Sequence, residues 1–398
     1  MRLLLAHNFY QQFGGEDAAY LMDKRMLSEQ GAGSIEVRTY ERNNKDIRTF
    51  GLLDMARFPG ATISSRQTRD DIRKLVNAWK PDAAYIHNVF PLISPSLYFT
   101  LRDEGVLIIQ MMHDFRFLCP NGWFFTHGHV CEKCKHGNTL PAIAFRCYRD
   151  NYALSAVYAA SVAAARRNGV LDVIDIIACP SPFMADKLEG VGVPRSRIRI
   201  KPHHIDAASR RASPGQGDYV LFMGRLSPEK GLRTLLDAIR LAPEIPLRIA
   251  GTGPSETDAR RFAADHQLHN VSFEGFQSGE AKWKLLEGAR IVVAPSECYE
   301  TFGMVVLEAF ACGKPVVATW IGSFPHLIED GATGRLVPPG DPAALAEAIK
   351  VVFNDVAACR TMGTRGRELA EQTYNADENY RILHGMIETA ASRREKNA

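Results

Sequence analysis

Short apolar runs alternate with helical patterns along nearly the whole chain, and this rhythm limits the possible folds more than any other feature of the sequence. Apolar runs of a few residues, each followed by a turn and an amphipathic stretch, are typical of βαβ units in a parallel sheet. The sequence therefore predicts an α/β protein. The expected strands lie at 3–6, 35–40, 83–87, 106–112, 173–178 and 198–201 in the first half, and at 219–223, 246–250, 271–273 and 291–294 in the second.

The rhythm stops between residues 203 and 218, where the chain is polar and rich in Ser, Gly and Pro. Such a composition marks a domain boundary. A length of 398 residues, 46% of them apolar and 23% charged, suits two soluble domains. We therefore expect two doubly wound, Rossmann-like domains, at 1–205 and 206–376, that face each other across a cleft. A last helix is expected from 377, with a fraying tail up to 398.

The N-terminal sequence MRLLLAHNFY has one Arg and too short an apolar stretch for a signal peptide, and it is better explained as a first strand. No apolar run reaches the ~18 residues of a membrane-spanning helix. Eight cysteines without an export signal argue against a disulfide framework. These features predict a cytoplasmic protein.

The net charge of +3 hides an asymmetry between the two halves. Residues 1–213 hold 28 Lys and Arg against 21 Asp and Glu, a net +7, whereas the remainder holds 20 against 24, a net −4. A basic first half could meet an anionic partner, such as a lipid-linked phosphate or a membrane surface. An ordinary solvated surface would look the same.

A helix start flanked by two carboxylates lies at 295–319, PSECYETFGMVVLEAFACGKPVVAT. Gly303 lets the backbone approach a ligand, and the first N–H groups of the apolar helix after it would face an anion. At a rise of ~1.5 Å per helical residue, Glu300 and Glu308 stand ~10 Å apart, which matches the two ends of a nucleotide sugar. Alternatively, Glu300 only caps the helix and Glu308 is solvated. Glu297 lacks this spacing to Glu308.

Two further turns of the second half carry candidate phosphate contacts. In GRLSPEKG, Arg225 and Lys230 flank a strand-to-helix turn, where both cations could bind a diphosphate without a metal, or could simply be solvated. The turn GTGP, at 251–254, lacks the third glycine of a dinucleotide fingerprint. It therefore argues against NAD and for a tight turn near a nucleotide.

Three histidines, His7, His87 and His113, fall at or just after the C-terminal ends of expected strands. That edge is where open α/β sheets bind ligands. Each histidine could instead be a hydrogen-bonded structural residue. Glu16, after the first strand, could support a ligand there or be an ordinary acidic residue of a first helical turn.

Four cysteines enclose a polar, histidine-rich segment at 119–147, where the βαβ rhythm breaks. Cys131-x2-Cys134 has the spacing of a metal knuckle, and with Cys119 and Cys147 it could hold a tetrahedral structural zinc. Such a metal would order about thirty residues that lack an apolar core. A histidine at 127, 129 or 136 could replace one thiol. Buried free thiols and a redox-sensitive pair are the alternatives.

The patterns PSxxExFGxxxxEAxxxGxPVVA and GRLxxxKG resemble the donor-binding signature of the retaining glycosyltransferases of the group-4 family (glycosyl transferases group 1), which have the GT-B architecture. The resemblance covers nearly the whole chain. It implies that Arg225 and Lys230 bind the diphosphate, Glu308 the ribose and Glu300 the sugar hydroxyls. His113, in His-Asp after a strand, resembles the acceptor-domain histidine that faces the donor sugar. The final helix resembles the one that crosses back to the first domain.

The resemblance also implies further donor contacts, of which Phe276 would hold the base unless it packs in the core. These are Gly14, Gly15, Gly224, Gly251, Phe276, Thr301, Phe302, Gly303 and Met304.

The resemblance implies transfer of a hexosyl group from a UDP- or GDP-sugar to an acceptor hydroxyl, with retention, in polysaccharide or glycolipid biosynthesis. It implies a saccharide or lipid-linked acceptor, peripheral contact with the inner membrane, no nucleic-acid partner and no cofactor for catalysis. The leaving phosphate would help to deprotonate the acceptor, so no dedicated general base is assigned. The alternatives are a nucleotide-sugar epimerase or phosphorylase on the same fold, and a non-catalytic sugar-nucleotide-binding protein whose Cys segment recruits a partner or nucleic acid.

Overall fold

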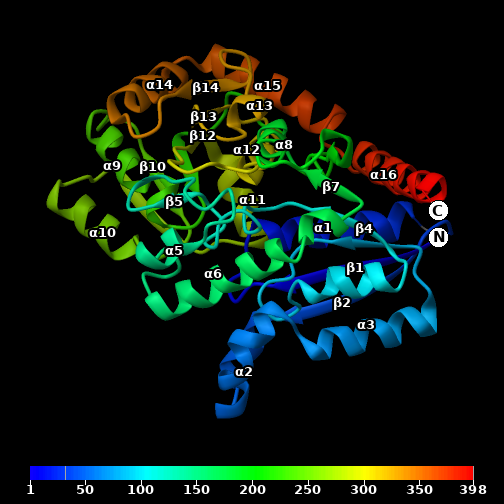
Figure 1. Ribbon diagram of the computed structural model, residues 1–398. Coiled ribbons are helices and arrows are strands. Elements are labelled where there is room, and N and C mark those ends of the chain that lie inside the picture. The colour runs from blue at the N-terminus through cyan, green and yellow to red at the C-terminus, as the bar shows by residue number, and fades with distance from the viewer. Residues whose placement is uncertain (32, 398) are drawn as a thin grey trace. The chain divides into compact units, whose positions relative to one another are not determined.

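The computed structural model describes residues 1–31 and 33–397, which divide into two compact units (Figure 1). The first unit comprises residues 1–126, 131–202 and those from Asp377 onward, and the second comprises 127–130 and 203–376. Each unit is built on one six-stranded sheet. The predicted class, α/β with two doubly wound parallel sheets, is confirmed. The cleft between the two domains stays a prediction.

The first sheet has the strand order β2-β1-β3-β4-β7-β8, and every neighbouring pair is parallel. Apolar side chains on both faces of its central strands are fully buried, as parallel sheets covered by helices require. The strands are β1 (Arg2–Phe9), β2 (Glu36–Asn43), β3 (Ala83–Ile86), β4 (Leu107–Met111), β7 (Ile176–Cys179) and β8 (Ile198–Ile200).

The second sheet has the order β11-β10-β9-β12-β13-β14 and is also parallel throughout. Its strands and the helices between them share one buried apolar core. The strands are β9 (Tyr219–Met223), β10 (Leu247–Ala250), β11 (Val271–Gly275), β12 (Ala289–Ala294), β13 (Val316–Thr319) and β14 (Gly334–Val337).

Helices connect successive strands in both units (Figure 1). Those of the first unit are α1 (Gly15–Gln30), α2 (Leu52–Ile63), α3 (Arg66–Trp79), α4 (Ser96–Asp103), α5 (Leu140–Ala144), α6 (Tyr152–Arg167), α7 (Val170–Val173) and α8 (Pro182–Glu189), with the 3-10 turns η1 (Asn44–Thr49) and η2 (Arg195–Arg197) and the short strand β5 (Phe125–Thr126). The short strand β6 (His129–Val130), which pairs with β5, belongs to the second unit. The second unit has η3 (Pro228–Lys230), α9 (Leu232–Arg240), α10 (Glu256–Asp265), α11 (Gly279–Gly288), α12 (Met304–Ala311), α13 (Phe324–Leu327), α14 (Pro342–Asn354) and α15 (Val356–Gln372), followed by α16 (Ala376–Asn397).

One expectation about the bounds of an element was wrong. The apolar run expected as a strand at 173–178 is divided, because Gly169 has φ 73 and starts the short helix α7, so that β7 begins only at Ile176. The last helix extends to Asn397, and the fraying of the tail stays a prediction. No helix within the described residues is long and apolar enough to cross a membrane.

Each sheet has a point at which the chain reverses the direction in which it adds strands. In the first sheet this switch point lies between β1 and β3, and in the second between β9 and β12. Ligands of open α/β sheets bind outside the carboxyl ends of the strands at such points. The loops after these four strands are therefore where a site is expected.

Candidate functional site

Lys230 and Glu300 form an ion pair at the switch point of the second sheet, with Nζ 2.5 Å from Oε1. Lys230 ends the 3-10 turn after β9, and Glu300 lies in the loop after β12. Ser296 Oγ donates a hydrogen bond of 2.5 Å to the same oxygen. The structure thus joins two residues that the sequence placed in separate motifs.

The charge states of this pair follow from their surroundings. Burial by itself raises the pKa of Glu300, but the charge of Lys230 and hydrogen bonds from Lys230 and Ser296 hold the pKa below its usual value. Burial lowers the pKa of Lys230, whereas the charge of Glu300 raises it, and the net result is a raised pKa. The pair is therefore ionised at neutral pH, with Glu300 able only to accept hydrogen bonds and Lys230 able only to donate them.

Backbone packing fixes the two loops that carry this pair. Gly231 follows Lys230 and has φ 68. A Cβ atom at Gly231 would come within 1.8 Å of the carbonyl oxygen of Pro295, so a larger residue would push the two loops apart. Glu297, in the same loop as Glu300, accepts a 2.6 Å hydrogen bond from Thr234 Oγ1 and has a different role.

The Thr-Phe-Gly turn before α12 is held from the side by Ser323, which is fully buried. Its N–H donates to the carbonyl of Glu300 at 2.9 Å, and its Oγ donates to the carbonyl of Phe302 at 2.6 Å. Gly303 has φ 97 and is the N-cap residue of α12, with no side-chain cap. The alternative in which Glu300 only caps this helix is therefore wrong.

Glu308 lies within α12 and is 9% exposed. Lys282 of α11 places its Nζ 2.5 Å from Oε1 of Glu308. The alternative in which Glu308 is a solvated surface residue is wrong. Sequence reasoning missed Lys282, Ser296 and Ser323, because a lysine on a surface helix and a serine in a turn are too common to single out without the fold.

The other expected donor residues lie after the strands of the second sheet or before α12. Gly224 and Arg225 follow β9, Gly251 follows β10 and Phe276 follows β11, so all four stand at the carboxyl edge that also carries Glu300. Arg225 is exposed. Phe276 is 59% exposed, which rules out the alternative that it packs in the core. Thr301 and Met304, which flank the Phe302-Gly303 turn, are partly buried.

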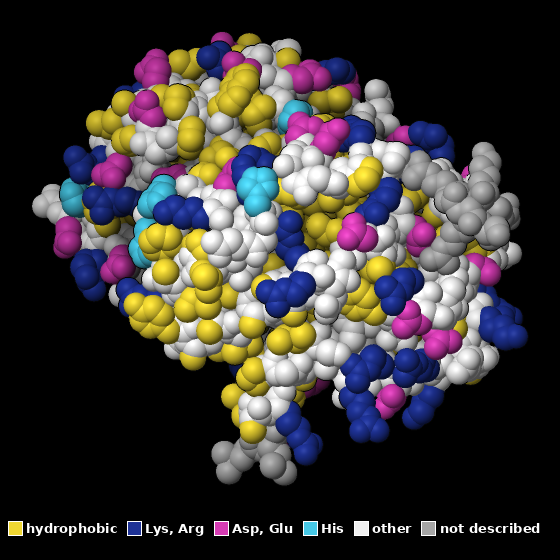
Figure 2. Space-filling view, viewed as in Figure 1, with side chains coloured by type: hydrophobic (Ala, Val, Ile, Leu, Met, Phe, Trp, Pro, Cys, Tyr) yellow, Lys and Arg dark blue, Asp and Glu magenta, His cyan; other side chains and the backbone are white. Residues whose placement is uncertain are grey.

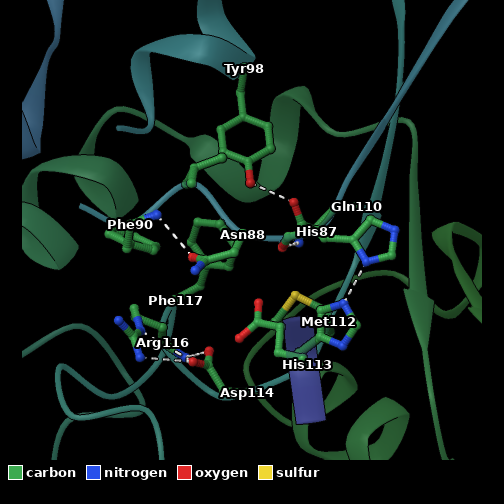
Figure 3. A pocket seen from close by; sticks show the side chains of 12 residues that line it. His87, Asn88, Phe90, Tyr98, Gln110, Met112, His113, Asp114, Arg116 and Phe117 are labelled. Carbon is green, nitrogen blue, oxygen red and sulfur yellow. Dashed lines mark hydrogen bonds and ion pairs between the residues drawn. The ribbon is translucent and has the colours of Figure 1, made fainter. Parts of the chain in front are cut away.

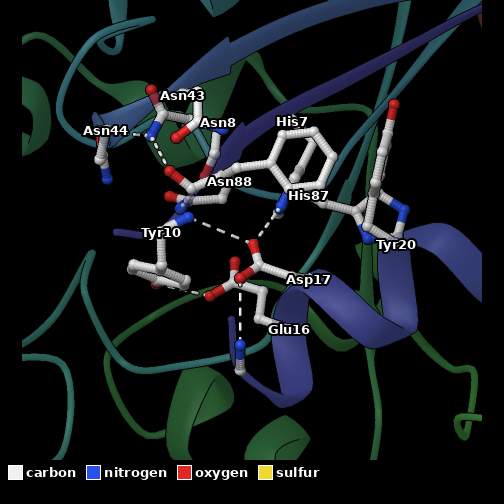
Figure 4. Close-up of polar contacts among 12 residues, drawn as sticks. His7, Asn8, Tyr10, Glu16, Asp17, Tyr20, Asn43, Asn44, His87 and Asn88 are labelled. Atoms are coloured by element: carbon white, nitrogen blue, oxygen red, sulfur yellow. Dashed lines mark hydrogen bonds and ion pairs between the residues drawn. The ribbon is translucent and has the colours of Figure 1, made fainter. Parts of the chain in front are cut away.

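In the first unit, His7 near the end of β1 is fully buried. Its Nε2 lies 2.8 Å from Asp17 Oδ1, and its ring stacks on Tyr20 with centroids 4.4 Å apart (Figure 4). Asp17 also accepts hydrogen bonds from the N–H groups of Tyr10 (3.3 Å) and Gly14 (3.1 Å). Gly14 caps α1 and Gly15 is its first residue, so Asp17 fastens this glycine loop to the sheet edge.

His87 and His113, which follow β3 and β4, contact each other with Nδ1 and Nε2 2.8 Å apart (Figure 3). The Nε2 of His87 lies 3.6 Å from Oδ2 of Asp23. Asp23 in turn accepts hydrogen bonds from Tyr85 (2.7 Å) and from the buried Lys201 (2.9 Å). A carboxylate at this position favours a proton on Nε2 of His87, which makes Nδ1 of His87 the acceptor for Nε2–H of His113.

A pocket of the first unit is lined by His87 and His113 together with Glu16, Asp114 and Arg116 (Figure 3). Arg116 NH2 lies 3.1 Å from Asp114 Oδ2, and Tyr10 donates a 2.6 Å hydrogen bond to Glu16. Burial raises the pKa of Glu16 well above its usual value, and the charge of Asp114 raises it further, against smaller opposing effects of Tyr10 and Arg116. The sequence analysis considered Glu16 but missed Asp114 and Arg116.

Cys119, Cys131, Cys134 and Cys147 line a second, small cavity of the first unit. All four are free thiols, and burial raises the pKa of Cys119 to about 12 and of Cys134 to about 11. Within the described part of the chain, no group of three His, Cys, Asp or Glu residues is placed to hold a metal ion. The zinc hypothesis stays a prediction.

The second unit matches a known protein family. A profile of the family "Glycosyl transferases group 1" matches residues 206–369. Residues 206–369 thus carry a domain that matches the glycosyl transferases group 1 family. The chain is 33% identical over 184 residues to the O-antigen chain mannosyltransferase C of Escherichia coli, covering 45% of this chain and 49% of the relative. It is 38% identical over 149 residues to the phosphatidyl-myo-inositol mannosyltransferase of Mycobacterium leprae, covering 36% and 39%.

The chain thus spans about half the length, or less, of these two relatives. The similarity to solved structures extends over both units. The Anabaena protein Alr3699/HepE in complex with UDP matches with a TM-score of 0.67 and 20% identity, over 98% of this chain and 100% of that one. This confirms the GT-B fold class that the sequence predicted.

Proposed function

We propose that this protein is a glycosyltransferase of the group 1 family that moves a hexosyl group from a nucleoside diphosphate sugar to an acceptor hydroxyl, with retention. The observation that carries the proposal is the ionised Lys230–Glu300 pair, held with Ser296 at the switch point of the second sheet. It sets a fixed cation and a fixed hydrogen-bond acceptor side by side at the edge where α/β sheets bind nucleotides. A UDP complex among the similar structures and the two mannosyltransferase names support the same class of donor.

In this proposal Lys230 and Arg225 stabilise the leaving diphosphate. Negative charge grows on the diphosphate as the bond to the sugar breaks, and fixed cations lower the energy of that charge. The raised pKa of Lys230 keeps it cationic throughout. The N–H groups at the start of α12, after Gly303, add further donors to the phosphates. These groups need no bound cofactor for this step.

The two carboxylates bind hydroxyl groups of the donor in this scheme. Glu300 is ionised and accepts hydrogen bonds from the transferred sugar, while Lys230 keeps it oriented. Glu308, oriented by Lys282, accepts from the ribose. Because each carboxylate is already held by a lysine, the site loses little side-chain freedom when the donor binds.

The pocket of the first unit provides the acceptor side of the proposed reaction. It carries His113, oriented by His87, and the polar groups of Glu16, Asp114 and Arg116. Such a lining suits a hydroxyl-rich saccharide or a lipid-linked sugar. We infer a role in polysaccharide or glycolipid synthesis at the cytoplasmic face of a membrane, which the relatives' names support. Sedimentation with anionic and with neutral vesicles tests the membrane contact.

The donor is tested by thermal unfolding with a panel of UDP-, GDP- and ADP-sugars. A ligand at 100 times its Kd stabilises the folded state by about 2.7 kcal/mol, which raises Tm clearly. We expect one base and sugar to raise Tm in the wild type, and Glu308→Gln to lose most of that rise. Glu297→Gln is the matched control, because its amide oxygen can still accept from Thr234 and it leaves the donor contacts intact.

Turnover is then followed as release of the nucleoside diphosphate, with and without saccharide or lipid-linked acceptors, and the anomeric form of the product is read by NMR. Retention with an acceptor-dependent product supports the proposal. Isomerisation of the donor without an acceptor would point to an epimerase, and phosphate-dependent release to a phosphorylase. Donor binding without any turnover would indicate a non-catalytic binding protein. If no sugar nucleotide binds or reacts, the proposal is wrong.

A further inference from the structure

The cavity lined by the four cysteines lies in the segment 119–147, whose apolar core beyond Phe124 and Phe125 is small. The local buried cluster consists of Cys134, Ala142 and Ala159, with Ile143 and Cys147 packed against it. Two large apolar side chains near this cluster are exposed to solvent: Leu140 is 68% exposed and Tyr152 is 60% exposed. Figure 2 shows hydrophobic side chains gathered over the region of α5 and the start of α6. Apolar burial in the segment thus comes mainly from Phe124 and Phe125, at 1% and 8% exposure, and from this small cluster.

The backbone of the same segment is unusually strained. Of the eight non-glycine residues with positive φ in the described chain, five lie between 124 and 150. They are Phe124, His127, Arg146, Arg149 and Asp150, with φ between 48 and 53. Each such conformation costs of the order of 1 kcal/mol for a residue other than Gly or Asn. A segment with a small core and this strain needs another source of stability.

The cysteines are brought together from distant points of the segment. Cys119 follows the β4 loop, Cys131 and Cys134 lie in one turn, and Cys147 follows α5. All four line the same cavity, along with Asn121, Thr126 and Phe145. Convergence of four free thiols on one small cavity is what a tetrahedral Cys₄ zinc site requires.

We propose that these four cysteines bind one Zn²⁺ ion that holds the 119–147 segment folded. Four S–H bonds break, the four protons leave to solvent, and four Zn–S bonds form, with no change of oxidation state. The site then carries a charge of −2. Cations stand nearby to offset it: Lys133 lies over the ring of the cavity residue Phe145, with Nζ 4.5 Å from the ring centroid, and Lys135 is in the same turn.

Hydrogen bonds orient two of the four thiols in this structure. Cys119 donates a hydrogen bond to Asn121 Oδ1 at 3.0 Å, and Cys147 points to Thr126 Oγ1 at 3.6 Å. A thiolate has no proton to donate, so deprotonation removes the reason for both orientations. Cysteine has a single side-chain torsion, and a change of rotamer about it turns the sulfur toward the cavity. His127, His129 and His136 are exposed, so we assign all four ligands to cysteine.

The test uses the full chain, purified under reducing conditions and dialysed against a weak chelator. We expect about one zinc per chain by mass spectrometry of metals, and with Co²⁺ the visible absorption of a tetrahedral four-sulfur site. Cys131→Ser and Cys134→Ser should lose the metal. Cys179→Ala is the matched control, because Cys179 is buried at the end of β7 in the same unit but outside this cavity.

A second measurement covers variants that fail to fold. In the wild type, alkylation followed by mass spectrometry should find these four thiols protected until a strong chelator is added, with a fall of Tm on metal removal. These readouts need no activity, so they stand or fall independently of the proposed function. Zinc lost to the weak chelator, zinc kept by both serine variants, or a disulfide among the four cysteines would each overturn the proposal.

Discussion

Each unit has a six-stranded parallel sheet with one switch point, but the chemistry near that point differs. In the second unit, lysines pair with glutamates of other elements: Lys230 with Glu300 after β12, and Lys282 of α11 with Glu308 of α12, each at 2.5 Å. In the first unit, histidines line the same edge, and the charges that control them lie behind the pocket, in Asp23 and the fully buried Lys201.

Under the proposed function, the difference follows from what each site would have to do. A diphosphate is negatively charged. The lysines of the second unit can bind it while still paired with their glutamates, because their side chains are 30% and 25% exposed. An acceptor hydroxyl is neutral, so the first unit needs orientation and proton placement rather than net charge. A buried network provides both, because charges interact more strongly away from water.

The largest effect is expected where the second unit loses its fixed cation. Lys230→Met should lower kcat/KM by about 10²- to 10³-fold, because one fixed donor to the growing charge is lost. It should also destabilise the fold by about 1 to 3 kcal/mol, since Glu300 is left without its charge partner and the pair is only partly exposed. Steady-state kinetics and urea unfolding measure the two effects.

The double variant Lys230→Met/Glu300→Gln separates stability from chemistry. It should recover most of the stability but not the turnover, because the unpaired charge is gone while the cation is still missing. Lys350→Met, a change of the same kind on α14, should alter neither. Recovery of turnover in the double variant would contradict a role for Lys230 in charge stabilisation.

The histidine network of the first unit should give the next largest effect. His87→Ala should lower kcat by about 10- to 100-fold with an unchanged KM for the donor, as expected for a residue that orients another, and should shift the pH profile of kcat. An asparagine amide can take the place of Nδ1 of His87, the atom that contacts His113, whereas a glutamine amide takes that of Nε2. His87→Asn should therefore retain more activity than His87→Gln.

His7→Gln is the control for this series, because His7 is paired with Asp17 and does not line the pocket. It should change Tm more than kcat. Equal losses in the Asn and Gln variants at position 87 would show that His87 is a packing residue only.

The carboxylates of the two units should respond to pH in opposite directions. The pKa of Glu300 is lowered on folding, so its ionisation stabilises the fold above an ordinary Glu pKa and this contribution is lost as pH falls through the folded value. The pKa of Glu16 is raised on folding, so stability is lost as pH rises from about 4.3 toward the folded value. At pH 8, Glu300→Gln should thus destabilise the protein and Glu16→Gln should stabilise it, each by on the order of 1 kcal/mol.

Urea unfolding at intervals between pH 4 and 8 checks this contrast. The Glu16 difference should shrink as pH falls toward 4, because Glu16 is then protonated in the folded chain and becomes protonated in the unfolded chain. The Glu300 difference should persist to lower pH, because the folded pKa of Glu300 lies below the ordinary value. Two differences of the same sign at pH 8 would show that the surroundings of the two carboxylates do not differ as described.

The motif residues of the second unit could be predicted because each lies in a local pattern. Glu300 and Glu308 share one helix start, and Lys230 follows a strand in GRLSPEKG, so the strand rhythm alone brings them to one edge. The pairing partners could not be predicted, because Lys282 and Ser296 carry no local signal. The first unit shows this limit more strongly: Asp23 and Lys201 are 178 residues apart, and only the sheet order brings them together.

The smallest effect is expected at Phe276, an exposed residue at the edge of the proposed donor site. Phe276 follows β11 and is 59% exposed, so Phe276→Ala should change stability by less than about 0.5 kcal/mol. If its ring stacks on the base of the donor, KM for the donor should rise about 3- to 10-fold with kcat unchanged, because stacking contributes roughly 1 kcal/mol. Leu241→Ala, at another exposed apolar residue of the second unit, should leave KM as it is. An equal KM in both variants would place the base elsewhere and reduce Phe276 to a surface residue.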